Sequence, residues 1–421
     1  MNLKHLTFCL VAATALRMPA AQAVEVTIAC DSDNGRALCQ EGADIWAKKT
    51  GNTVKTIPLP PGSERLGIYQ QFLAAQSTVV DIYTIDVVWT GVLANYLVDM
   101  REQAAAVLPD HFPAIVKNNT VDGRLVAMPW YGDTGLLFYR KDLLQKYGEK
   151  PPQTWEELEE SARRIQAAAR RDDPASKLWG YVWQGAASET LTCDALEWVA
   201  SYGGGTLVDR DGKVDIDNPR AIKALQRAHG WVGTISPPEV VTFDEEKARA
   251  VFQVGQAVYM RNWPYAWGHA NAQDSVIKGK VGVMALPKGG ADGIPAATLG
   301  GQLLAVSRYS RHSKEAVDLV MYLTSRQEQR RRAILGGFNP TITALYKDQE
   351  VIAANPYQAD LYGTLAHATA RPSAQTKARY TQASSEFWNA AHSVLTGQSD
   401  AATAVKTLDT RLRALTRNGN W

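Results

Sequence analysis

The sequence lacks the common motifs for metal binding, for a serine nucleophile, for a dinucleotide cofactor and for nucleic-acid binding. Its seven histidines are scattered without H-x-x-H or H-E-x-x-H spacing, so we expect no metal site. It has neither the G-x-S-x-G turn of a serine hydrolase nor a G-x-G-x-x-G after a predicted strand, and we expect no cofactor. The 45 basic and 43 acidic side chains give a net charge of +2, which offers no basis for binding nucleic acid or an anionic membrane.

Long apolar runs are absent after the N-terminus, so we expect no insertion into a membrane. Residues 1–23 are different, because Lys4 is followed by an apolar run and by an A-x-A sequence before Val24. This is the pattern of a secretory signal peptide. We therefore expect an exported, periplasmic protein. Cys9 would be removed with the signal peptide.

Cysteine is scarce, with four residues in the chain. Cys30 and Cys39 bracket a short, turn-rich segment between a predicted strand and a predicted helix, and an oxidising compartment permits a disulfide there. We predict this disulfide. Cys193 stands alone in "LTCDALEW", and we interpret it as a small buried apolar residue of a helix.

Strand and helix patterns alternate in the first part of the chain. Residues 24–29, 52–59 and 80–89 are typical of strands, and residues 41–51 and 64–76 between them are typical of helices. This order predicts a mostly parallel sheet covered by helices. The clearest helix follows Thr154, which forms a predicted capping box with Glu157. Two α/β lobes with several crossings between them fit the whole pattern better than two domains joined by a single linker.

Two features are candidates for a functional site. The stretch "RNWPYAW", residues 261–267, concentrates flat aromatic surface, which can fill a core or support a flat ligand. Asp86 and Asp133 lie at the ends of predicted strands. Two suitably spaced carboxylates can act as a glycosidase pair, and they can equally accept hydrogen bonds from sugar hydroxyls.

Several longer blocks resemble the periplasmic solute-binding proteins of ABC sugar importers (extracellular solute-binding protein family 1), in particular their trehalose/maltose-binding group. The blocks are "VDIYTIDVVWTG", "GRLVAMPWYGDTGLLFYRKDLLQKYG", "WGYVWQG", "RNWPYAWGHANAQDS", "KGKVGVMALP" and "AATLGG". The resemblance implies an α/β, two-lobed periplasmic-binding-protein fold (type II, maltose-binding-protein-like) with a ligand cleft between the lobes. The expected N-terminal lobe comprises residues 24–135 and about 292–345, and the C-terminal lobe residues 136–291 and about 346–421.

The resemblance also implies which residues contact the ligand. Trp263 is the expected platform for one sugar ring, with Tyr265 at its side and Trp267 in the core. Asp86 and Asp133 are the expected hydroxyl acceptors, on opposite sides of the cleft. Gly132 and Gly135 suggest a bend where the chain changes lobes. The full expected set is Arg65, Asp86, Tyr131, Asp133, Trp263, Tyr265, Gly300, Gly301, Gln302 and Arg371.

Two positions depart from the family pattern. Gln302 replaces a tryptophan that often closes over the sugar, and residues 31–39 offer no matching glutamate, for which Asp33 or Asn34 can substitute. The expected protein is a monomeric receptor without catalytic activity that captures a disaccharide or small oligosaccharide, trehalose or maltose favoured, and delivers it to an ABC permease. Two alternatives stay open. One is a secreted glycoside hydrolase using Asp86 and Asp133, and the other is a binding protein for a polyol, a sugar phosphate or another non-disaccharide ligand.

Overall fold

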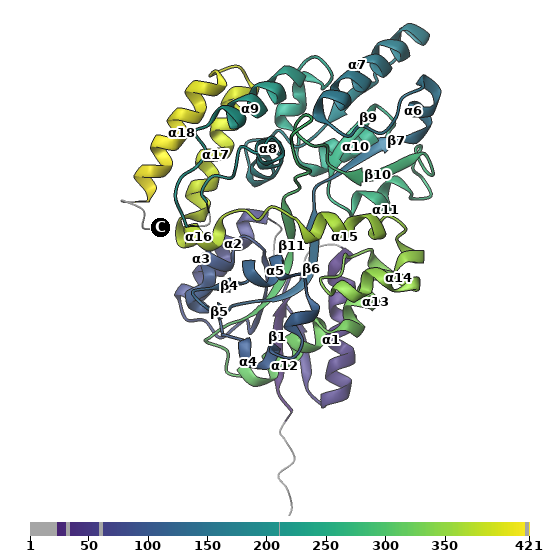
Figure 1. Cartoon of the computed structure of the whole chain (residues 1–421). Coiled ribbons are helices and arrows are strands. Elements are labelled where there is room, and N and C mark those ends of the chain that lie inside the picture. The colour runs from purple at the N-terminus through teal and green to yellow at the C-terminus, as the bar shows by residue number, and fades with distance from the viewer. Residues whose placement is uncertain (1–22, 31–33, 59–61, 210, 417–420) are drawn as a thin grey trace, which may run out of the picture.

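The computed structural model describes residues 23–30, 34–58, 62–209, 211–416 and 421. The expected signal peptide, with Cys9, lies outside the described residues except for Ala23, and so does Asp33. Within the described ranges, no helix is both long enough and apolar enough to cross a membrane. Figure 1 shows two lobes, one above the other, each built from helices around a sheet.

The lower lobe of Figure 1 contains a five-stranded sheet in the order β2-β1-β3-β11-β6. Its strands are β1 (Glu25–Ala29), β2 (Thr53–Thr56), β3 (Ile82–Asp86), β6 (Met128–Thr134) and β11 (Leu299–Val306). The first three run parallel, as the strand–helix alternation predicts, whereas β11 returns from the second half of the chain and pairs antiparallel with both β3 and β6. The strand β11 thus lies between two strands that are close together in the sequence.

Helices cover this first sheet. The larger ones are α1 (Asn34–Thr50), α2 (Gly62–Ala74), α12 (Ser313–Leu323) and α13 (Arg326–Gly336). The smaller elements are α3 (Thr90–Leu93), α4 (Arg101–Ala104), α5 (Pro113–Asn118) and the hairpin β4 (Thr120–Val121) and β5 (Arg124–Leu125). The helix α1 begins earlier than we expected, so residues 34–39 are helical and not a turn. Cys39, Ala43 and Trp46 explain the difference, because they share one buried face of the helix.

The upper lobe contains a four-stranded sheet in the order β10-β7-β9-β8. Its strands are β7 (Leu136–Arg140), β8 (Trp179–Val182), β9 (Ala257–Asn262) and β10 (Val281–Ala285). Its helices are α6 (Lys141–Tyr147), α7 (Trp155–Asp172), α8 (Glu189–Ser201), α9 (Pro219–Trp231), α10 (Glu245–Gln253), α11 (Ala266–Ala270), α17 (Tyr380–Leu395) and α18 (Ala401–Leu415). The predicted cap of α7 is confirmed, because the Thr154 hydroxyl accepts a hydrogen bond from the Glu157 amide at 3.1 Å.

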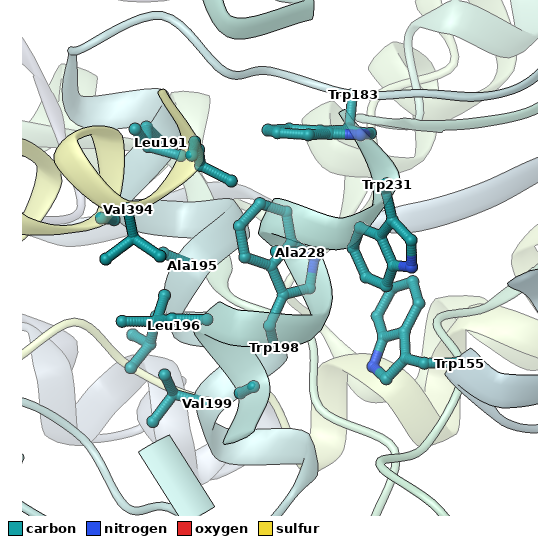
Figure 2. Close-up of a cluster of buried hydrophobic side chains, with 14 of the residues drawn as sticks. Trp155, Trp183, Leu191, Ala195, Leu196, Trp198, Val199, Ala228, Trp231 and Val394 are labelled. Atoms are coloured by element: carbon teal, nitrogen blue, oxygen red, sulfur yellow. The ribbon is translucent and has the colours of Figure 1, made fainter. Parts of the chain in front are cut away.

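Four buried tryptophans form a continuous contact in the core of the upper lobe (Figure 2). The ring of Trp183 packs edge-on against Trp198 with centroids 5.0 Å apart, and Trp198 packs edge-on against Trp231 at 5.6 Å. Trp231 also contacts Trp155, with a centroid separation of 5.5 Å. Such edge-to-face pairs add about 0.5–1.5 kcal/mol each to the burial of apolar area. These four of the twelve tryptophans serve the fold and not a ligand.

The chain passes between the lobes at Gly135, again between β10 and β11, and again after residue 366. The second and third passages lie side by side, because Thr298 and Thr369 form a parallel bridge. Gly135 lies at the predicted lobe change, but its φ is not positive, and neither is that of Gly132. A Cβ atom at Gly135 would lie 2.1 Å from Oε1 of Glu197, so glycine is required there for close packing.

Residues 346–366, which we expected in the C-terminal lobe, contact both lobes. The helix α14 (Gln349–Ala354) packs on α13, and α15 (Gln358–Ala366) contacts both β6 and β10. Tyr346 and Tyr362 pack on Phe112 of the lower lobe, with ring centroids 5.5 and 5.4 Å away. These contacts put part of this segment with the lower lobe, and the division of the chain into lobes stays a prediction.

The predicted pairing of Cys30 with Cys39 is present in the structure, where the two sulfur atoms are bonded. The bond joins the end of β1 to the second turn of α1. We expect that replacing both cysteines by serine lowers the free energy of unfolding by about 2–3 kcal/mol, because the unfolded chain is then less restricted. Denaturant unfolding of the native protein and the double variant measures this difference.

A reductant provides the control for this prediction. It should destabilise the native protein and leave the double-serine variant unchanged. Two free thiols at these positions, found by alkylation without reduction followed by mass spectrometry, would rule the disulfide out.

Candidate functional site

A cavity of about 610 Å³ lies where the two lobes meet. The lower lobe contributes residues of β3, β6 and β11, and the upper lobe contributes the loop after β9 and the starts of α8 and α10. Its lining is Leu66, Asp86, Val88, Trp89, Tyr131, Asp133, Ala187, Ser188, Glu189, Thr190, Cys193, Glu245, Trp263, Tyr265, Gly300, Gly301, Gln302, Arg371, Tyr380, Thr381 and Trp388.

Nine of the ten residues that the resemblance implied line this cavity, and Arg65 is the exception. The Arg65 guanidinium lies behind the lining, where Nη2 donates to Oε1 of Gln302 at 3.3 Å. The same group lies 5.3 Å from the ring centre of Trp89. Arg65 therefore orients Gln302, the residue that replaces the family's tryptophan.

Asp86 and Asp133 both belong to the lower lobe, so the expectation that they face each other across the cleft is wrong. The strand β11 separates them, with Gln302 paired to Asp86 and Gly300 paired to Asp133. Asp133 is thus two strand spacings, about 10 Å, across the sheet from Asp86, and two residues, about 7 Å, further along the strands. Asp86 accepts from the amide of Val88 at 3.0 Å, whereas Asp133 accepts from Nδ2 of Asn339 at 3.0 Å. The order of the strands in the sequence does not predict this arrangement, because β11, which lies between β3 and β6 in the sheet, comes from the second half of the chain.

The two glycines of β11 let the backbone and an aromatic ring approach closely. A Cβ atom at Gly301, whose φ is +114°, would lie 2.2 Å from the carbonyl oxygen of Tyr131. A Cβ atom at Gly300 would lie 2.8 Å from Cζ3 of Trp263. The indole of the upper lobe thus reaches the sheet of the lower lobe only because residue 300 has no side chain.

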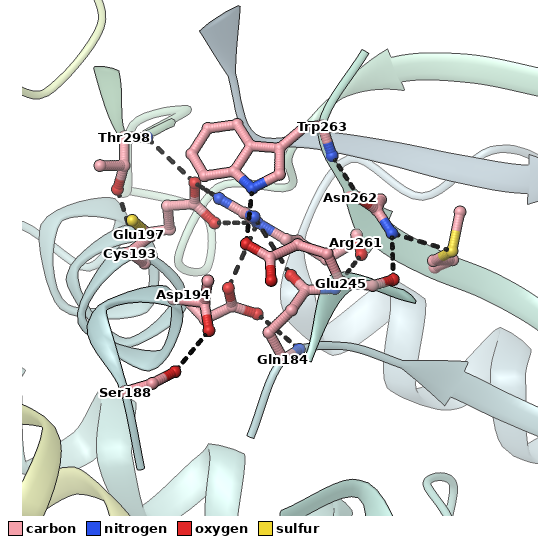
Figure 3. Close-up of polar contacts among 12 residues, drawn as sticks. Gln184, Ser188, Cys193, Asp194, Glu197, Glu245, Arg261, Asn262, Trp263 and Thr298 are labelled. Carbon is pink, nitrogen blue, oxygen red and sulfur yellow. Dashed lines mark hydrogen bonds and ion pairs between the residues drawn. The ribbon is translucent and has the colours of Figure 1, made fainter. Parts of the chain in front are cut away.

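Trp263 is held from below by a buried cation (Figure 3). The Arg261 guanidinium is fully buried and lies 4.1 Å from the centre of the indole ring. It donates from Nε and Nη2 to the two oxygens of Glu197, at 2.9 and 2.6 Å, and from Nη1 to Gln184 at 3.1 Å. Asp194 lies 3.4 Å from Nε, and burial raises the pKa of this aspartate well above its usual value.

The edge of the Trp263 ring is also fixed. Its Nε1 donates to Oε1 of Glu245 at 3.3 Å, and burial raises the pKa of this glutamate. Tyr265, with 40% of its surface exposed, donates its hydroxyl to Glu246 at 2.6 Å. Trp267 does not line the cavity and packs against Tyr357 with ring centroids 5.4 Å apart, as a core residue would. One short stretch therefore supplies a platform, a flanking ring and a packing residue.

Arg371 connects the two lobes across the cavity. Its Nη1 donates to Oε1 of Glu189 on α8 at 2.6 Å, while its Nη2 lies 3.5 Å from Oδ1 of Asp86 on β3. Glu189 also accepts from the hydroxyl of Ser384 at 2.6 Å and from the hydroxyl of Tyr380. Glu189 and Glu245 were not among the expected site residues, because neither stands in a motif and each reaches the cavity from the first turn of a helix.

The described residues that line the cavity offer groups suited to binding a ligand. Among the residues that the structure describes, no group of three or more His, Cys, Asp or Glu side chains is placed to hold a metal ion. Cys193 lines the cavity but is almost fully buried, and this burial raises the pKa of its thiol far above the usual range. The thiol is thus kept in its unreactive, neutral form, in agreement with the expected small buried residue.

Comparisons with known proteins agree with this geometry. Residues 32–330 match the family "Bacterial extracellular solute-binding protein". A "Probable ABC transporter-binding protein" of Deinococcus radiodurans is 51% identical over 403 residues, which cover 95% of each chain. Among solved structures, maltose-bound T. maritima MalE3 is 39% identical with a TM-score of 0.85, over 93% of this chain and all of that one.

A more distant structure supports the fold alone. A solute-binding protein of Agrobacterium radiobacter K84 in complex with ribitol is 23% identical with a TM-score of 0.80, over 93% of this chain and 98% of that one.

The match over residues 32–330 and the Deinococcus relative set aside the glycoside hydrolase, because this family binds solutes and is not enzymatic. The chain therefore belongs to the bacterial extracellular solute-binding proteins and is the solute-binding receptor of an ABC importer.

Proposed function

We propose that the receptor binds a disaccharide or small oligosaccharide in the cavity, with the Trp263 ring as its platform. The position of this ring carries the proposal. A half-buried indole that borders a cavity, supported from below by Arg261 and at its edge by Glu245, presents one flat apolar face. The C–H face of a pyranose is complementary to such a surface.

The polar groups around the platform suit the hydroxyl rim of a sugar. Asp86, Asp133 and Glu189 provide carboxylate acceptors, and Gln302 and Arg371 provide donors. Most of these groups are already oriented by protein partners, which lowers the entropic cost of ordering them when a ligand binds. A neutral ligand rich in hydroxyls satisfies them without leaving a buried charge unpaired.

We infer that an α-glucoside of the trehalose or maltose type is favoured. The 39% identical relative was solved with maltose bound, which supports this class. A polyol is the second candidate, because a distant structure contains ribitol, but an open-chain polyol has no flat face to cover an indole. A sugar phosphate fits less well, since the cavity is lined by four carboxylates, those of Asp86, Asp133, Glu189 and Glu245, and by one arginine, Arg371.

We further propose that the receptor works in the periplasm as a monomer and delivers its ligand to a membrane permease. The Cys30–Cys39 disulfide fits an oxidising compartment outside the cytoplasm. The position of the cavity between two lobes joined by three chain passages suits a hinge-type closure around the ligand.

We predict that Trp263→Ala weakens binding of maltose or trehalose by roughly 30- to 150-fold, because the lost indole contact is worth about 2–3 kcal/mol. Native affinity should be near micromolar, at about 0.3 kcal/mol for each of the roughly 23 heavy atoms. Calorimetric titration measures the affinities, and a melting curve checks the fold.

Trp179→Ala is the matched control, because Trp179 is half-buried in β8 and does not line the cavity. It should keep the native affinity. If Trp263→Ala bound normally but had a collapsed melting temperature, the aromatic stretch would be ordinary core and the platform would be excluded.

We also predict that Asp86→Ala and Asp133→Ala each reduce the affinity for the sugar tenfold or more, because a hydrogen bond to a charged acceptor is worth roughly 1.5–3 kcal/mol. The exposed residue Asp274 supplies a control, and Asp274→Ala should bind as the native protein does. Titration of the three variants with the same sugar gives the comparison. Unchanged affinity in both cavity variants would contradict the assigned acceptors, and product release from a nitrophenyl glycoside would contradict a pure binding function.

A further inference from the structure

We propose that Lys377 is a strained pivot between the lobes, and that the strain in its backbone opposes closure of the receptor. Lys377 does not line the cavity, so this pivot lowers the affinity for every ligand by the same factor. The inference concerns the closure of the lobes and does not depend on which sugar is bound.

The third passage between the lobes is first attached to the lower lobe. The short helix α16 (Ser373–Thr376) and the 3-10 turn η5 (Lys377–Arg379) pack on α3, as Figure 1 shows for α16. The packing is close, because a Cβ atom at Gly91 of α3 would lie 2.2 Å from the carbonyl oxygen of Ser373 and 3.1 Å from the Cα atom of Lys377. The chain is therefore fixed to the lower lobe as far as Lys377.

The next helix, α17, is fixed to the upper lobe from its first residue. The hydroxyl of Tyr380 bonds to Glu189 on α8, and the hydroxyl of Ser384 bonds to the same carboxylate at 2.6 Å. Two residues separate Lys377 from Tyr380. A rotation of one lobe against the other must therefore be absorbed, in this passage, by the backbone dihedral angles of Lys377 and the two residues that follow it.

Lys377 has a backbone conformation that suits glycine. Its φ is +48° and its ψ is −127°, in the region that mirrors the β conformation, where a Cβ atom is crowded. Two other described residues that are not glycine have a positive φ: Gln76 follows α2, and Asp122 lies in the turn of the β4–β5 hairpin, where aspartate is common. The strain at Lys377 coincides with the point where the attachments to the two lobes meet, and such strain persists only where the surrounding contacts impose it.

The side chain of Lys377 does not explain this conformation. Its Nζ lies 2.9 Å from Oδ1 of Asp122, but the two side chains are 44% and 62% exposed, and exposed ion pairs contribute little. The backbone contacts with Gly91 and the attachment of Tyr380 to the upper lobe impose the strain instead.

The lobes are closed on one another in this structure. The Trp263 ring lies against Gly300 of the other lobe, and Arg371 connects the two lobes. When the lobes separate, α17 moves away from α3, and the dihedral angles of Lys377 are released. The strain then belongs to the closed state, and it lowers the fraction of ligand-free receptor that is closed. The apparent affinity falls by the same factor, because the ligand binds the closed state.

The test exchanges Lys377 for glycine, which adopts this conformation without strain. We expect Lys377→Gly to bind maltose and trehalose about fivefold or more tightly than the native protein, with the same factor for each sugar. Lys377→Ala is the matched control, because it loses the ion pair to Asp122 but keeps the Cβ atom, and its affinity should stay within about twofold of the native value. Gln76→Gly relieves a positive φ away from the passages and should bind as the native protein does. Calorimetric titration measures these affinities.

Single-molecule energy transfer measures the closed fraction without a ligand. Dyes are attached to cysteines introduced at Gln70 of α2 and Lys247 of α10, which are exposed positions on helices that reach the cavity from different lobes. The ratio of closed to open molecules should rise about fivefold or more in Lys377→Gly and stay at the native value in Lys377→Ala.

The outcomes separate the pivot from the proposed function. If Lys377→Gly folds and keeps the native affinity and the native closed fraction, the pivot is overturned, since the strain is then the same in the open and closed states. Equal tightening in Lys377→Ala also overturns it, because the ion pair to Asp122 would then be the cause. If the native protein binds neither sugar, the proposed ligand fails, and the closed fraction alone decides on the pivot. A melting curve of each variant shows that folded proteins are compared.

Discussion

The buried ion pair between Arg261 and Glu197 is the interaction on which the site depends. Isolated charges cannot be buried without a cost of several kcal/mol each, and the cost is offset only when the hydrogen bonds of both groups are satisfied. Here Glu197 receives two bonds from Arg261 and a third, at 3.0 Å, from the amide of Thr298. The same carboxylate leaves no room for a side chain at Gly135. One residue of α8 thus contacts the support of the platform and two of the passages between the lobes.

This arrangement couples ligand contact to the geometry of the passages. Trp263 rests on Arg261, and Thr298 and Gly135 belong to the segments that join the lobes. Arg371, in the third passage, reaches Glu189 of one lobe and Asp86 of the other, and it also donates to the carbonyl oxygen of Leu299 at 3.3 Å. The bonds of Arg371 thus include a carboxylate that lines the cavity from each lobe and the backbone of a passage between the lobes. A change in the position of either lobe must alter bonds that also orient the ligand-facing side chains.

Local patterns and the family resemblance could be read from the sequence, whereas long-range placement could not. The cap of α7 is a contact between neighbours, so Thr154 and Glu157 suffice to predict it. Asp86 and Asp133 were recognised as cavity residues, but their common sheet depends on β11, which comes more than 160 residues after Asp133. Trp388 was not expected to line the cavity, because the sequence does not distinguish it from tryptophans of the core, such as Trp198, among the twelve in the chain. The early start of α1 was missed because an Asn-Gly pair resembles a turn until the buried face at Cys39 is known.

The contact between Gly300 and Trp263 joins a strand of the lower lobe to the platform of the upper lobe. Any larger residue at position 300 would act as a wedge that holds the lobes apart without touching a hydroxyl of the ligand. Affinity would then be lost through the closure equilibrium and not through recognition, and every ligand would lose the same factor. The absence of a side chain at Gly300 thus determines how completely the lobes can close, whereas the neighbouring polar groups determine which ligand is bound.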